Sequence, residues 1–215
     1  MLRPVMMPAL LLLMWAALPE SSVATMRLVA AEIPIDDYGL YDQVVAKKFL
    51  TSRTRLVMVE RLTVCRLLPD QQEPTTLAFF DERKYFDGAL PRDLIRDFVG
   101  SNREPARLEG RFQFGVSYRF VSGNRVEDEE ALSGRPVSAS DARPVSPPSV
   151  LDRLAFSRVG RTLRNDQALL YVEHVRPDGT GAGFLVWFRR QGPEWMIVDT
   201  DVVWTARTEE SEEAP

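Results

Sequence analysis

His174 is the only histidine in the chain, and its ordinary pKa makes it the one side chain that would titrate near neutral pH. In the strand expected around it, Glu173 points to the opposite face and cannot orient the imidazole. A catalytic pair would need Asp178, Asp199 or Asp201 to approach from elsewhere. We therefore keep His174 with such a carboxylate as the enzyme hypothesis, and prefer a structural or surface histidine at a strand end.

Asp199 and Asp201 are two residues apart on an expected strand, so their side chains share one face and are the weak candidates for a shared cation. Two carboxylates are too few for calcium without more oxygen ligands, and no D-x-D-x-D-G loop is present. A solvated strand face is the simpler interpretation. With a single Cys and a single His, the chain also lacks the ligands of a usual zinc site and the partner for an internal disulfide.

Two further patterns are typical of cofactor or nucleophile chemistry, and neither has the context that the chemistry needs. The Gly-rich string at 179–183 lies between two expected strands with no helix after it, which favours a hairpin over a phosphate loop. Cys65 lies in an apolar strand, which favours an inert buried thiol. We therefore expect no cofactor and no metal.

Arg158 is the most distinctive polar residue of the C-terminal half. A guanidinium presents a planar set of donors that fits a carboxylate. Arg158 could therefore pair with a buried partner such as Asp199 and fix the sheet, or it could line a ligand pocket. We favour the structural pairing and keep Arg158 as the binding candidate.

The region around Arg158 carries a series of residue types at characteristic spacings: Ser157, Arg158, Val159, Gly160, Gln167, Ala168, Leu169, Tyr171, Val172, Gly181, Gly183, Trp195 and Trp204. In these positions the chain resembles a family of uncharacterised secreted bacterial proteins. The resemblance implies an exported α+β domain. It implies no catalytic residue.

The elements that would position these side chains follow from periodicity and turn residues. Helices are expected within 33–50 and at 91–99, and strands at 55–65, 112–121, 166–175, 183–190 and 195–205. Because Pro177-Asp178-Gly179 and Gln191-Gly192-Pro193 are short turns, the last three strands form an antiparallel meander. The sequence predicts a single α+β domain over 25–206, with an antiparallel sheet of four to six strands packed on N-terminal helices.

Residues 1–24 are typical of a signal peptide: Arg3 is followed by the uncharged apolar run Val5–Leu18 and by Ser22-Val23-Ala24, a small-x-small cleavage site. A second cut after Ala31 is an alternative. As a helix the apolar run would extend about 21 Å, short of the roughly 30 Å hydrocarbon core of a bilayer. The sequence predicts a periplasmic or extracellular protein without a stable membrane anchor after cleavage.

Two segments outside this core are expected to lie on the surface. Residues 122–149 are rich in Pro, Gly and Ser and form a loop, and 207–215 form a disordered acidic tail. The net charge of −4 shows no concentrated basic face, which argues against nucleic acid as a partner.

These observations together predict an exported, non-enzymatic binding or accessory domain of the bacterial envelope, whose partner is a protein or a small-molecule ligand. The alternative is a small hydrolase- or lyase-like enzyme that uses His174 with a carboxylate in a sheet-lined pocket. A third hypothesis is an interaction protein that acts through the 122–149 loop or the tail.

Overall fold

The structure, a computed structural model, describes residues 32–123, 125–127, 149–176 and 179–206, with the side chains of 149–152 left out. The predicted signal peptide, most of the 122–149 loop and the tail at 207–215 lie outside the described residues. The described residues form three α-helices and one sheet.

Three α-helices precede or interrupt the strands: α1 (Ile35–Val44), α2 (Leu77–Arg83) and α3 (Arg92–Ser101). A π-helical turn, η1 (Val45–Phe49), extends α1, and a 3-10 turn, η2 (Tyr85–Gly88), follows α2. The helices predicted within 33–50 and at 91–99 are both present. No helix in the described residues has the length and apolarity that crossing a bilayer requires.

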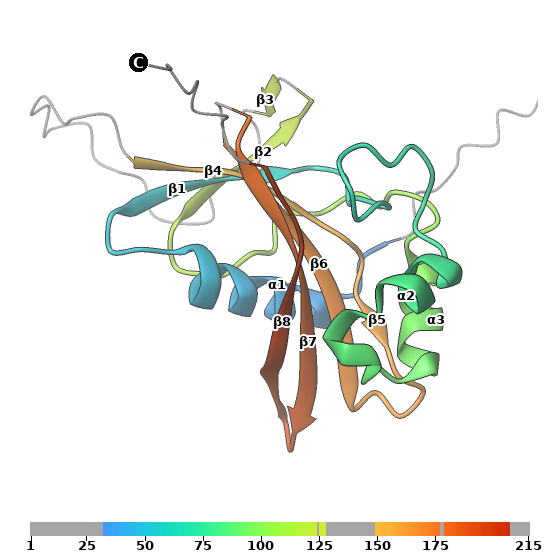
Figure 1. The fold of residues 1–215 in the computed structure, drawn as a ribbon. Helices are drawn as coiled ribbons and strands as arrows, with labels where there is room; N and C mark the ends of the chain where they lie inside the picture. Colours follow the sequence, from blue (N-terminus) through green and yellow to red (C-terminus); the bar gives the residue numbers. More distant parts are fainter. Residues whose placement is uncertain (1–31, 124, 128–148, 177–178, 207–215) are drawn as a thin grey trace, which may run out of the picture.

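The strands form one eight-stranded sheet, in the order β3-β2-β1-β4-β6-β7-β8 with β5 paired to β6 (Figure 1). Their bounds are β1 (Thr54–Glu60), β2 (Ser117–Ser122), β3 (Arg125–Glu127), β4 (Ser149–Phe156), β5 (Gly160–Arg161), β6 (Gln167–Val175), β7 (Gly181–Gln191) and β8 (Glu194–Ala206). The predicted α+β class is confirmed. The meander of β6, β7 and β8 is antiparallel throughout, as predicted.

The prediction of an antiparallel sheet with four to six strands is wrong, because β1 pairs in parallel with both β2 and β4 and makes the sheet mixed. Parallel neighbours are joined by long crossovers, so no short turn in the sequence indicated how β1, β2 and β4 pair. β4 was not predicted as a strand at all. It begins where the Pro- and Ser-rich segment ends, and its partner β1 lies about a hundred residues earlier in the chain.

The strand predicted at 112–121 is only partly correct, since β2 begins at Ser117. Phe112 and Phe114 alternate with polar residues because their side chains pack in a cluster of aromatic rings. They do not belong to a paired β-strand. The Phe112 ring lies 5.3 Å from Tyr38 of α1 and 5.3 Å from Tyr118 of β2. Within the predicted loop, residues 125–127 form β3 against β2.

The sheet has a hydrophobic core on each face. On one face, α1 packs with Tyr41 and Val44 against side chains of β1, β4, β6 and β7. On the other face, α2, η2 and α3 pack against Leu169 and Tyr171 of β6 and Leu185 of β7. Figure 1 shows the two groups of helices on either side of the strands.

A chain of hydrogen bonds through Tyr171 joins the second core to the edge of the sheet. The Trp204 indole Nε1 donates to the Tyr171 hydroxyl at 2.7 Å, and this hydroxyl donates to the Leu67 carbonyl at 3.0 Å. A Cβ on Gly183 would collide with both the Trp204 indole and the Tyr171 hydroxyl. Burial raises the pKa of Tyr171 well above its ordinary value, so the hydroxyl keeps its proton and donates.

The backbone of Tyr171 is fixed in the same way. Its N–H donates to the Ser157 hydroxyl at 2.9 Å, and that hydroxyl donates to the Arg158 carbonyl at 2.9 Å. A Cβ on Gly160 would lie 2.5 Å from the Cα of Phe98, so glycine allows α3 to approach the sheet closely. Ser157, Gly160, Tyr171, Gly183 and Trp204 therefore have structural roles.

Replacing Tyr171 by Phe tests how much the hydrogen bonds of the Tyr171 hydroxyl contribute to the free energy of unfolding. The substitution leaves the Leu67 carbonyl and the Trp204 N–H without their partner, so we expect a loss of about 2 kcal/mol in the free energy of unfolding, measured by urea denaturation. Tyr85→Phe is the matched control, because the buried Tyr85 hydroxyl has no hydrogen-bond partner among the described residues. Equal losses in the two variants would contradict the network's role.

Candidate functional site

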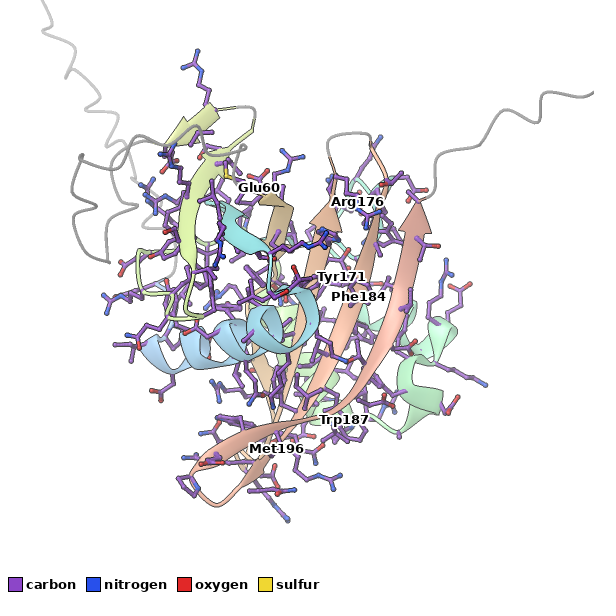
Figure 2. All side chains as sticks on the ribbon, turned by 90° about the vertical axis from the view of Figure 1, so that its left-hand side faces the viewer. Glu60, Tyr171, Arg176, Phe184, Trp187 and Met196 are labelled. Carbon is purple, nitrogen blue, oxygen red and sulfur yellow. The ribbon has the colours of Figure 1, made fainter. Side chains whose placement is uncertain are left out.

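The helices of the second face cover β6 only as far as Tyr171, and a pocket opens beyond it. The pocket encloses about 230 Å³ between the ends of β1, β4 and β6 and the segment that follows β1. Figure 2 shows Glu60 and Arg176 toward this end of the sheet, with Met196 near the tip of the β7–β8 hairpin at the other. The lining residues are Glu60, Leu62, Thr63, Val64, Arg66, Arg153, Ala155, Glu173 and Val175.

Strand register places the two carboxylates of the pocket on either side of a small residue. Val59 pairs with Leu154, so Glu60, the next residue, lies beside Ala155. Ala155 in turn pairs with Glu173 of β6. Neighbouring strands are about 4.8 Å apart, so the backbones of the two glutamates are about 10 Å apart. The short Ala155 side chain between them forms the floor of the pocket.

The two carboxylates differ in their partners. Glu60 forms an ion pair with Arg153, with 2.9 Å between the carboxylate Oε1 and the guanidinium Nη1. Glu173 is half-buried and makes no hydrogen bond or ion pair with any described residue, although Arg66 and Arg153 are near enough to act on it electrostatically. The pocket therefore contains a carboxylate that accepts no hydrogen bond from a described residue.

Burial raises the pKa of Glu173 against the opposing effect of Arg66 and Arg153. Burial also raises the pKa of Glu60, with a contribution from the charge of Glu173 and an opposing one from Arg153. In both cases the effect of burial outweighs that of the neighbouring arginines. Asp42 of α1 is a useful contrast: burial raises its pKa to about 6, but its Oδ1 accepts a hydrogen bond from the Gln113 N–H at 2.9 Å.

The walls determine what such a pocket can hold. Leu62, Val64 and Val175 offer apolar surface, while Glu173 offers an unpaired negative charge. A positively charged group on an aliphatic stem would fit both features, because the ammonium would restore the partner that Glu173 lacks. The described residues contain no group of three or more His, Cys, Asp or Glu that could hold a metal ion.

The structure places the predicted catalytic candidates on opposite faces of the sheet. The His174 ring lies 5.5 Å from Phe49 of η1, on the face that α1 covers. Asp199 is paired with Trp187 and Asp201 with Leu185 across β7 and β8. Leu185 and Trp187 both pack in the second core, so the two aspartates lie on the face of that core, opposite to His174. Neither aspartate can therefore orient the imidazole of His174, and Asp178 lies outside the described residues.

Asp199 and Asp201 share one face, but each has its own structural contact. Asp201 Oδ2 accepts a hydrogen bond from the Phe86 N–H at 2.9 Å. Phe86 has a φ of 55°, a conformation that costs energy for a non-glycine residue, so Asp201 stabilises the η2 turn. Asp199 Oδ1 accepts from the Thr200 N–H at 2.7 Å.

Arg158 forms no ion pair with Asp199. Its Nη1 donates to the Ser101 carbonyl at 3.2 Å and its backbone N–H donates to Asn102 Oδ1 at 2.7 Å. These bonds attach the connection between β4 and β5 to the end of α3. Arg158 also lines a separate open pocket of about 460 Å³ beside α3. Cys65 is half-buried and burial raises the pKa of its thiol.

Comparison with known proteins adds no relative: no protein-family model, curated protein or solved structure matches this chain. The resemblance described above stays a prediction.

Glu60 and Glu173 were not predicted as site residues. Glu60 stands out in the sequence as the one charged residue among apolar side chains on its face of the strand, and Glu173 as the charged residue between apolar neighbours. Those were the available signals. The register that places both beside Ala155 depends on the parallel pairing of β1 with β4, which the sequence did not show.

Glu173→Gln tests whether the carboxylate is a cost to the fold. A raised pKa means that the folded state holds the proton more tightly, so stability falls as pH rises from the ordinary value of 4.5 through the folded pKa. The variant should gain on the order of 0.5–1 kcal/mol near pH 8 and nothing near pH 4, measured by urea denaturation. A loss of stability near pH 8 would instead show that the arginines hold Glu173 as a structural ion pair.

Proposed function

We propose that this protein is an exported, non-enzymatic binding domain of the bacterial envelope, and that the pocket at Glu60, Ala155 and Glu173 takes a small ligand through a positively charged group. Export rests on the signal-peptide pattern of residues 1–24. Binding rests on the geometry of the pocket.

The observation that carries the proposal is the carboxylate of Glu173. A half-buried charge without a hydrogen-bond donor destabilises the fold, and such groups concentrate at functional sites. Glu60 already has Arg153 as its partner. A ligand that brings an ammonium group to Glu173 would supply the direct hydrogen-bonded partner that this carboxylate lacks among the described residues, while its stem would cover Leu62 and Val175.

Titration of the purified protein with pentylammonium chloride, followed by amide chemical shifts in NMR, tests binding directly. We expect shifts confined to the ends of β1, β4 and β6 and to residues 62–66. The affinity should be at least tenfold weaker in Glu173→Gln, since the charge that pairs with the ammonium is removed. Ala155→Val should weaken binding by filling the floor of the pocket while leaving every charge in place.

Glu82→Gln is the matched control, because Glu82 is an exposed carboxylate of α2 that does not line the pocket. Its affinity for pentylammonium should equal that of the wild-type protein. Affinity unchanged in both Glu173→Gln and Ala155→Val, or shifts confined to other elements, would refute the site.

Export is tested by expressing the full chain in a bacterial host and measuring the intact mass of the protein in each cell fraction. We expect a periplasmic or secreted form that lacks residues 1–24 or 1–31, because the small residues at Ala24 and Ala31 fit the cleavage sites of signal peptidases. A form of full mass found only in the cytosol would overturn this part of the proposal.

A further inference from the structure

A second pocket adjoins the pocket at Glu173, and Arg66 lines both. The second pocket encloses about 320 Å³ and shares Val64 and Arg66 with the first. It is lined by Val64, Cys65, Arg66, Gln72, Glu73, Pro74, Arg103 and Pro105. We call the two together the Arg66 groove. The two halves of the groove differ in charge.

On the sheet side, Glu60 forms an ion pair with Arg153, whereas Glu173 forms no ion pair with a described residue and feels the charges of Arg66 and Arg153 only at longer range. On the loop side, Arg66 and Arg103 are both exposed, and neither forms an ion pair with a described residue. Glu73 is the one carboxylate among the residues that line this half. The groove therefore presents a negative charge at one end and an excess of positive charge at the other.

The walls of the loop side are held in place by hydrogen bonds. Two of these bonds join Thr63 to Ala106. The Thr63 N–H donates to the Ala106 carbonyl at 2.9 Å, and the Ala106 N–H donates to the Thr63 hydroxyl at 2.8 Å. Gln71 spans the loop by accepting from the Leu67 N–H and donating to the Glu73 carbonyl. Because these hydrogen bonds already hold the loop in one conformation, a ligand that binds there would lose less free energy in ordering the loop.

We propose, on the basis of the function proposed above, that the ligand is a small zwitterion whose ammonium group binds Glu173 and whose carboxylate binds Arg66 and Arg103. The two arginines supply planar donor sets that match a carboxylate. The apolar side chain of Val64, which lies in both halves, would contact the aliphatic part of the ligand between its charged ends.

The test compares ε-aminohexanoate with pentylammonium, which is the same molecule without the carboxylate, by isothermal titration calorimetry on the purified protein. ε-Aminohexanoate should bind at least tenfold more tightly. Arg103→Gln and Arg66→Gln should remove that preference, whereas Arg103→Gln should leave the affinity for pentylammonium unchanged. Arg164→Gln is the matched control, since Arg164 is exposed and lines neither half of the groove.

Amino acids with the ammonium at the far end of an aliphatic chain and short peptides both carry opposite charges at their two ends, and triglycine separates these two sources. Tighter binding of triglycine than of ε-aminohexanoate would assign the groove to short peptides, and the reverse order would assign it to amino acids of the aliphatic kind. Equal affinities for ε-aminohexanoate and pentylammonium, both weakened by Glu173→Gln, would overturn the zwitterion but leave the proposed function standing. Failure of every probe to bind would overturn both.

Discussion

The hydrogen bonds from Trp204 through Tyr171 to Leu67 hold together parts of the chain that lie far apart in sequence. The indole belongs to the last strand, the phenol to the middle of the sheet and the carbonyl to the segment that leads from β1 to α2. Because the phenol is buried and stays protonated, the same hydroxyl accepts from one side and donates to the other. The loop that carries Leu67 is thereby attached to the sheet, and the Leu67 side chain packs in the same core as α2 and α3.

The same interaction marks the boundary of the second core. Up to Tyr171, the residues of β6 on this face are enclosed by helices. Beyond it, the next residue on the face is Glu173, and the cover consists of the segment from Leu62 to Arg66. A small residue, Ala155, then leaves a hollow between two carboxylates. The pocket thus exists because the helices of the second core cover β6 only as far as Tyr171, whereas β6 continues beyond it. The polarity of the pocket follows from the side chains on this uncovered part of the sheet, Glu60 and Glu173.

Glu173 differs from the other half-buried acids of the protein in its hydrogen bonding. Glu60 and Asp42 are also half-buried acids, yet each has a donor at hydrogen-bond distance. Glu173 has none among the described residues, so its charge is a cost that the fold tolerates rather than a contact that stabilises it. Asp199, Asp201 and Arg158 show the opposite case: residue types that suggested chemistry, each engaged in holding a turn, a strand or a helix end.

Local sequence determined much of this protein. The α1 and α3 helices, the β6–β8 meander and its turns followed from periodicity and from Gly and Pro at positions such as Gly192, whose φ is 62°, because these features depend on residues close together in the chain. The tertiary structure alone decided that β1 lies between β2 and β4, that Phe112 packs in a loop, and that Glu60 and Glu173 meet across Ala155. Parallel pairing joins segments separated by long crossovers, and the register of such a pair is fixed by packing on both faces of the sheet rather than by any turn.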